Sequence, residues 1–167
     1  EEEITPDEVR RALRKGTLEH KIFPTFVGSA LRYIGIQRLT DGVVDYLPNP
    51  TEVPEIQGTD PQDKETKLSR PHDPSEPFSA LVFKIVNDQH GDLTYARIYS
   101  GTLEKGTRVL NANTGKKEMI SRIFEMHAKE RIARDAAYAG EIVALVGVKN
   151  SSTGDTLCDP NDPIVLE

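Results

Sequence analysis

The chain has 167 residues, of which 37% are hydrophobic and 29% are charged, and its formal net charge is −6 at pH 7. These proportions are typical of a globular protein, and the length allows one domain or a small domain with a fragment of another. No apolar run approaches the roughly 18 residues that cross a bilayer, which excludes a membrane-spanning helix. The one cysteine, Cys158, cannot form an internal disulfide, and no CxxC or paired-histidine spacing predicts a metal site. We therefore expect a cytoplasmic protein without a bound metal.

The start of the chain and its charge distribution are both uneven. The first three residues are glutamates, without an initiator methionine or a leader sequence, so we expect a piece of a longer protein. Residues 97–134 carry nine basic and four acidic side chains, a charge of +5 within an acidic chain. A basic surface binds nucleic-acid phosphates, whereas scattered charges on exposed strands only keep a protein soluble. From composition alone, both interpretations of this basic segment stay open.

A helix start is encoded near the beginning of the chain. Thr5 is a capping residue, Pro6 suits the first helical position, and Glu8 completes a capping box three residues after the cap. These residues predict a short helix that runs to about Lys15 and ends at Gly16.

The next segment predicts a strand, a loop and a second helix. Residues 22–27 form an apolar run of strand length, which stops at the small residues 28–30. A second set of apolar residues then recurs at helical spacing, at Ile36, Leu39, Val43, Val44 and Leu47. Pro48 ends this helix, and we expect its apolar face to pack on a sheet.

The middle of the chain predicts a domain boundary. Between residues 48 and 77 there are seven prolines with polar residues between them and no hydrophobic periodicity, which is typical of an extended connector. We therefore divide the chain into an α/β fragment at residues 1–47, a connector at residues 48–75 and a second domain at residues 76–167.

The second domain predicts mainly β structure. Five segments are rich in valine, isoleucine, phenylalanine, tyrosine and threonine, at residues 78–86, 93–99, 107–111, 117–126 and 142–148. Glycine-containing turn signals separate them, as in a small closed antiparallel barrel. The first of these strands is almost continuously apolar, so we expect the barrel core to cover one of its faces and a neighbouring domain to cover the other.

Catalysis by this chain alone is not expected. His90 with Asp92, and His127 with Asp135, are conceivable acid–base pairs, but no nucleophile with an oxyanion loop accompanies either pair. The phosphate-binding Gly-x-x-x-x-Gly-Lys-Ser/Thr loop, the Asp-x-x-Gly switch and the guanine-reading Asn-Lys-x-Asp motif are all absent from the sequence. We therefore expect no enzymatic activity and no bound cofactor.

Several segments, in chain order, resemble one family of proteins. They are Gly-Ser-Ala at 28–30, Val-Val-Asp-Tyr-Leu-Pro at 43–48, Ser-Glu-Pro-Phe-Ser-Ala-Leu-Val-Phe-Lys-Ile at 75–85, Arg-Ile-Tyr-Ser-Gly-Thr-Leu at 97–103, Met-His-Ala at 126–128, Tyr-Ala-Gly-Glu-Ile at 138–142 and Thr-Gly-Asp-Thr-Leu-Cys at 153–158. Together they resemble elongation factor G, a bacterial translational GTPase, over nearly the whole chain. The resemblance implies the end of the GTP-binding domain at residues 1–47 and the translation-factor-type β-barrel domain II at residues 76–167.

The resemblance also implies roles for individual residues. Gly28, Ser29 and Ala30 look like the fifth guanine-nucleotide motif, here a remnant of the guanine-contact loop that is inactive alone. The parent protein would use GTP and magnesium to drive translocation of tRNA and mRNA. Without the family, residues 28–30 are an ordinary strand-to-helix turn.

In the family, domain II docks on small-subunit ribosomal RNA and supports the GTP-binding domain. The expected partners are therefore the ribosome and the remaining domains of the parent factor, with no membrane and no DNA. The RNA-facing candidates are Arg97, Arg122, Lys129 and Arg131, which would contact phosphates without reading bases. His127 is the candidate for an interdomain contact, and its alternative is a hydrogen-bonded structural histidine.

Two alternatives remain at this stage. The chain resembles sister GTPases as well, namely a ribosomal protection protein or a duplicated elongation factor G. A member of a different class would be a free-standing β-barrel that binds a protein or a small ligand. A free-standing barrel is disfavoured, because the apolar face of the helix at residues 36–47 would then lack the sheet on which it should pack.

Overall fold

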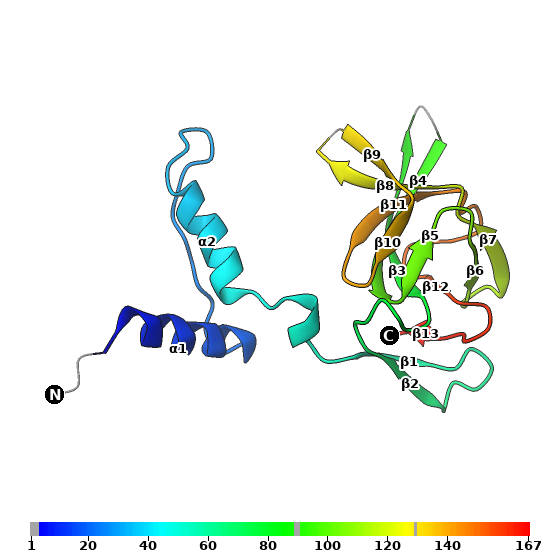
Figure 1. Ribbon diagram of the computed structural model, residues 1–167, viewed down its shortest axis with the longest axis horizontal. Coiled ribbons are helices and arrows are strands. Elements are labelled where there is room, and N and C mark those ends of the chain that lie inside the picture. The colour runs from blue at the N-terminus through cyan, green and yellow to red at the C-terminus, as the bar shows by residue number, and fades with distance from the viewer. Residues whose placement is uncertain (1–3, 89–90, 129) are drawn as a thin grey trace. The chain divides into compact units, whose positions relative to one another are not determined.

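Two helices, α1 (Pro6–Leu18) and α2 (Ile36–Tyr46), lie in the first of two structural units (Figure 1). The computed structural model describes residues 4–88, 91–128 and 130–167. It divides into one unit at Glu1–Val53 and a second at Pro54–Glu167. No helix within the described residues is long and apolar enough to span a membrane.

Helix α1 begins at the predicted capping box. The Thr5 amide donates to the Glu8 carboxylate over 2.8 Å, and the Glu8 amide donates to Thr5 Oγ1 over 3.3 Å. The predicted end at Gly16 is wrong, because the helix continues to Leu18. Gly16 instead allows close packing, since an added Cβ would lie 2.6 Å from Ile22 Cδ1. The glycine therefore serves a contact between α1 and the chain that follows it.

Helix α2 matches the predicted helix but not the predicted partner. The described residues of the first unit contain no sheet. Residues 22–27 form no strand, since a strand needs a hydrogen-bonded neighbour. The Phe26 ring packs on Gly42 instead, where an added Cβ would lie 2.3 Å from Phe26 Cζ. Arg14 of α1 donates to the Asp45 carbonyl over 2.8 Å and pairs with Glu52 over 2.7 Å, which places a cation at the C-terminal end of α2.

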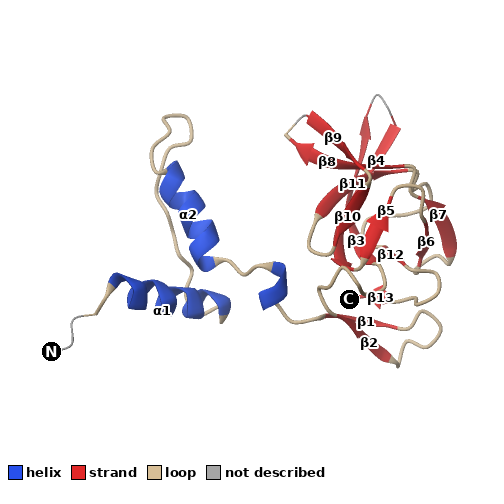
Figure 2. Ribbon diagram, in the orientation of Figure 1, coloured by secondary structure: helices blue, strands red, loops and turns tan. Residues whose placement is uncertain are grey.

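The second unit is built from antiparallel strands (Figure 2). Its largest sheet has the strand order β7-β6-β12-β3-β4-β11-β8-β9, a second sheet pairs β10 with β5, and a third has the order β13-β1-β2. The strands are β1 (Ile56–Thr59), β2 (Lys67–Arg70), β3 (Ser79–Asp88), β4 (Gly91–Ser100), β5 (Thr102–Glu104), β6 (Arg108–Asn111), β7 (Lys116–Met119), β8 (Arg122–His127), β9 (Glu130–Arg134), β10 (Ala136–Tyr138), β11 (Ile142–Val146), β12 (Thr156–Cys158) and β13 (Val165–Leu166). The fold is the predicted small antiparallel barrel.

The barrel core takes alternate residues from β4. On β4, the side chains of Thr94, Ala96, Ile98 and Ser100 are buried, so the other side chains of this strand lie on the outward face. The remaining core side chains are mainly aliphatic and include Val82, Leu103, Val109, Ile120, Ile123, Val143, Leu145 and Leu157. The core thus fixes which face of each strand is free for other contacts.

The structure differs from the predicted connector at residues 48–75. Strands β1 and β2 lie within this segment, pair with each other, and join β13 from the end of the chain. Their apolar side chains form a second cluster with Leu81, Ile164 and Leu166. The second unit therefore begins at Pro54, because an apolar cluster holds this proline-rich segment against the barrel.

The burial predicted for both faces of residues 78–86 is found in part within this unit, and cover by a neighbouring domain stays a prediction. Leu81 packs on the second cluster, so the β1-β2-β13 sheet covers the outward face of β3 at this point. Farther along β3, Phe83 and Ile85 are 42% and 36% exposed. Apolar residues of this segment thus contribute to both apolar clusters of the unit, and Phe83 and Ile85 remain accessible.

Candidate functional site

The outward face of β4, β11, β8 and β9 collects most of the predicted RNA-facing residues. Ile142 of β11 lies opposite Arg97, and Val146 lies opposite Arg122. Met126 of β8 lies opposite Arg131. Because residues opposite each other share a face, Arg97, Arg122 and Arg131 lie on one side of the sheet. Lys129, the fourth candidate, lies outside the described residues, as does His90.

Aromatic rings support the basic side chains on this face. The guanidinium carbon of Arg97 lies 5.0 Å from the ring centroid of Tyr99, and that of Arg122 lies 5.9 Å from the ring centroid of Phe124. Lys84 Nζ of β3 lies 5.8 Å from the ring centroid of Tyr95. Cations at these distances interact favourably with the ring face. The rings hold the cations on the surface without neutralising them.

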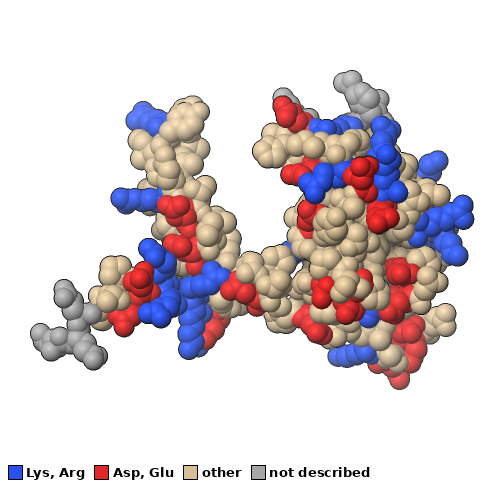
Figure 3. Space-filling model, viewed as in Figure 1, with Lys and Arg blue, Asp and Glu red and all other residues tan. Residues whose placement is uncertain are grey.

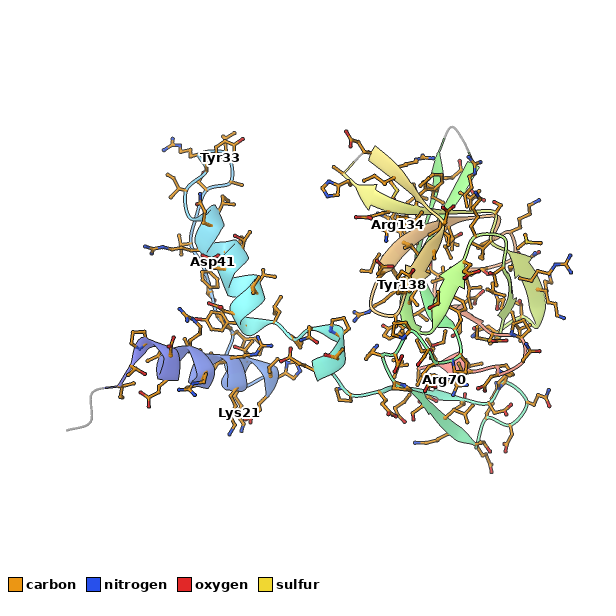
Figure 4. All side chains as sticks on the ribbon, in the orientation of Figure 1. Lys21, Tyr33, Asp41, Arg70, Arg134 and Tyr138 are labelled. Atoms are coloured by element: carbon orange, nitrogen blue, oxygen red, sulfur yellow. The ribbon has the colours of Figure 1, made fainter. Side chains whose placement is uncertain are left out.

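Two other arginines of this unit, Arg70 and Arg134, have acidic partners. Arg134 pairs with Glu125 and Glu141 on the other face of the sheet, and Arg70 pairs with Asp162 (Figure 4). Among the described residues, neither Arg97 nor Arg122 has a carboxylate within ion-pair distance. Because neither guanidinium group has a carboxylate partner among these residues, both can donate hydrogen bonds to an external anion.

We did not predict the supporting aromatic residues from the sequence, although it contains a signal for them. Tyr95, Arg97 and Tyr99 alternate at period two, as do Arg122 and Phe124. Alternation at this period places basic and aromatic side chains on one face of a strand. Alternating basic and aromatic residues therefore indicate a nucleic-acid-binding face more specifically than the net charge of the segment does.

Residues 28–30 lie in a tight turn of the first unit. Ser29 and Ile34 form an antiparallel bridge, in which the Ser29 amide donates to the Ile34 carbonyl over 2.9 Å. An added Cβ at Gly28 would lie 2.6 Å from the same carbonyl oxygen, so the turn requires glycine there. This geometry explains the small residues, and the guanine contact of Gly28, Ser29 and Ala30 stays a prediction.

His127 is exposed at the end of β8, opposite Glu130. Its role as an interdomain contact stays a prediction. The imagined pair with Asp135 is not formed, since Asp135 is exposed and lies 3.8 Å from Lys105 Nζ. Within the part of the chain that the structure describes, no group of three histidine, cysteine, aspartate or glutamate residues could hold a metal ion.

Comparison with known proteins shows which proteins the chain is similar to. The family model described as elongation factor Tu domain 2 matches residues 91–158. The chain is 51% identical to elongation factor G 1 of Methylococcus capsulatus and to elongation factor G 1 of Synechocystis, over 99% of its length in each case. It is 49% identical to elongation factor G of Salinibacter ruber over its whole length. The chain is therefore similar to a segment of elongation factor G over nearly all of its length.

Two further facts define the extent of this match. The chain spans 24% of the length of these elongation factor G relatives. A crystal structure of a Thermus thermophilus protein superposes with a TM-score of 0.68, at 23% identity, over 97% of this chain and 22% of that protein. At this identity the superposition supports the fold alone. The similarity to elongation factor G rests on the sequence relatives, and the segment matched by the domain 2 model contains the outward face described above.

Proposed function

We propose that this chain is a non-catalytic module of an elongation factor G that docks on small-subunit ribosomal RNA. The parent factor would be a cytoplasmic GTPase that uses GTP and magnesium to promote ribosomal translocation of tRNA and mRNA. Residues 1–47 would belong to its GTP-binding domain, and the barrel would be its domain II. The segment itself would neither bind nor hydrolyse GTP, because it lacks the phosphate-binding loop and the guanine-reading motif.

One observation supports the docking role above the others. Arg97 and Arg122 lie on aromatic rings of one outward face, without acidic partners among the described residues. Phosphate contacts from such side chains position a protein on RNA and make its binding sensitive to salt. Figure 3 shows Lys and Arg side chains interspersed with Asp and Glu side chains near β4, β8 and β9. The strand registers and the ring contacts of Arg97 and Arg122 favour an RNA contact through the β4-β11-β8-β9 face.

Binding to purified small ribosomal subunits over a salt series tests the proposal. Replacing Arg97, Arg122 and Arg131 by glutamine removes three candidate phosphate contacts. Each lost contact should reduce the slope of log affinity against log salt by about 0.7 to 0.9. We therefore expect the triple variant to bind more weakly at low salt, with a slope reduced by about two to three.

A charge-matched control separates docking from general attraction. Lys105, Arg108 and Lys116 are exposed basic residues elsewhere on the barrel, and replacing these three by glutamine changes the net charge equally. We expect this control to lose much less affinity than the first variant. Equal losses would mean that only net charge matters, and absence of binding at low salt would show that the docking proposal is wrong.

A further inference from the structure

A cleft opens on the outward face beside the arginines. Leu93 and Val146 line it, with the Phe124 ring, and the side chains of Asp92, Arg122 and Arg131 lie around them. Its volume is about 350 Å³, near the lower end of the roughly 300–1,000 Å³ range of small-molecule sites. Leu93 is only 3% exposed although it faces away from the barrel core. The cleft thus combines a recessed apolar floor with cationic walls.

We propose that this cleft binds one unstacked nucleotide of single-stranded RNA. The base packs on Leu93, Val146 and the Phe124 ring, and its phosphate faces the guanidinium group of Arg122. This inference rests on the proposed docking function and adds to it a recognition of the base itself. Phosphate contacts alone would leave the apolar floor of the cleft unused.

The chemistry of the lining favours a nucleotide over an acidic peptide. A base has a planar apolar surface that stacks on aromatic rings and on guanidinium planes, and both are present in Phe124 and Arg122. The Asp92 carboxylate at the rim accepts a hydrogen bond from Asn87 Nδ2 over 2.7 Å, and its remaining lone pairs can accept from amino groups of a base. An acidic side chain has no planar apolar surface that could stack on the Phe124 ring.

The recessed floor also favours a single strand over a duplex. In an RNA duplex the bases are stacked and paired, so the duplex presents mainly phosphates and ribose hydroxyls to a protein. Such a surface can reach the guanidinium groups at the rim but cannot place a flat apolar group on Leu93. An unpaired nucleotide from a loop, bulge or strand end can do both.

Methyl NMR spectra of the whole chain give a direct test. The probes are the octanucleotide of uridylate (rU8), an octamer of the same charge without bases, an RNA duplex, uridine monophosphate and an octamer of glutamate. We expect rU8 to shift the methyl resonances of Leu93 and Val146 through the ring current of a bound base. The octamer without bases and the duplex should shift the Arg122 side-chain resonances and leave both methyl groups unchanged. Uridine monophosphate should produce the same methyl shifts only at much higher concentration.

Two substitutions separate the base from the phosphate. Phe124→Leu should weaken rU8 binding by about tenfold, within the range for base–aromatic stacking, and leave the salt slope unchanged. Arg122→Gln should reduce the salt slope by about 0.7. Arg108→Gln, an exposed change away from the cleft, should alter neither quantity by more than the general effect of one charge. Unshifted core methyl resonances, such as those of Ile98 and Leu157, verify that each variant is folded.

The possible outcomes are decisive for this inference and separable from the docking proposal. If the chain binds small subunits but rU8 and the octamer without bases give identical spectra, the cleft inference is wrong and docking by phosphates stands. Equal affinity for uridine monophosphate and rU8, or methyl shifts with the glutamate octamer, would also overturn it. If neither small subunits nor any RNA binds at low salt, the docking proposal and the cleft inference are both wrong.

Discussion

The guanidinium group of Arg70 donates a hydrogen bond to the Asp162 carboxylate over 2.6 Å, which joins β2 to the segment before β13. The Arg70 side chain is 10% exposed, whereas that of Asp162 is 52% exposed. The pair therefore links two parts of the chain 92 residues apart at the edge of the second apolar cluster. Removing the acid would leave a nearly buried cation without its counterion.

We predict that Asp162→Ala destabilises the barrel unit by about 1–2 kcal/mol, since Asp162 is half exposed and water recovers part of the loss. Urea denaturation measures this change, and hydrogen exchange at the Leu166 amide should accelerate first. Glu65→Gln is the control, because it alters an exposed acid in the β1–β2 loop and should change the unfolding free energy by less than about 0.5 kcal/mol. Equal effects of the two substitutions would show that the ion pair does not stabilise the sheet.

Gly58 allows β1 and β13 to approach each other. An added Cβ would lie 2.4 Å from the Val165 carbonyl oxygen and 2.7 Å from Ile164 Cγ1. Gly58→Ala should therefore displace β13 and destabilise the unit by about 1–3 kcal/mol, the usual cost of overpacking. The neighbouring Gln57→Ala, on the exposed side of β1, should cost less than about 0.5 kcal/mol in the same urea experiment. A Gly58→Ala protein as stable as the parent would mean that β13 is not held against β1.

Local signals predicted part of this fold and long-range contacts determined the rest. The capping box at Thr5 and Glu8 and the apolar stripe of α2 are local, and both helices begin where they were expected. Strands β5, β10, β12 and β13 contain two or three residues each, which is too short for a periodicity. Strands β1 and β2 lack a local signal, since they depend on β13 at the far end of the sequence.

The basic residues of the candidate site could be predicted from the sequence, but their position on one surface could not. The basic character of Arg97, Arg122 and Arg131 is visible in the sequence. Their position on a common face depends on the registers of β4, β11, β8 and β9, which pair residues far apart in the chain. The unexpected break between residues 119 and 122 separates β7 from β8 and sends them to different parts of the sheet. The cleft beside Leu93 depends on the same registers.

Cys158 should make stability depend on pH in the alkaline range. Its side chain is fully buried, and this burial raises the pKa of the thiol above its ordinary value. The unfolded thiol ionises near pH 8.5 whereas the folded thiol stays neutral. The contribution of the Cys158 thiol to the free energy of unfolding is therefore complete below about pH 8.5. This contribution is lost as the pH rises through the raised folded pKa, by at most about 1.4 kcal/mol per pH unit.

The comparison of the parent chain with Cys158→Ala isolates this effect, because all other titrating groups are common to both proteins. We expect the difference in their unfolding free energies to be constant from pH 6 to 8 and to shrink from pH 8.5 to 10. Disulfide-forming reagents should modify Cys158 only as fast as the barrel opens. A constant difference up to pH 10 would mean that the folded thiol ionises as readily as the unfolded one.

The last prediction concerns the apolar face of α2 in the first unit. Leu39, Val43, Val44 and Leu47 are 46%, 49%, 78% and 52% exposed, and Gly42 is the one buried residue of the helix. A helix of this length has little stability of its own in water and depends on the burial of its apolar face. We therefore expect α2 to open with a much smaller free energy than the barrel core.

Hydrogen exchange of the monomer measures both parts in one sample. Amides of residues 39–46 should exchange orders of magnitude faster than those of Ala96 and Ile98 in β4, and helical circular dichroism should be lost at lower urea than the barrel structure. Gly42→Ala should accelerate exchange in α2 further, since its Cβ would displace the Phe26 ring, and should leave the barrel amides unchanged. Equal protection of α2 and β4 in the monomer would contradict this prediction, because the exposed stripe would then have to be covered by another surface of the chain.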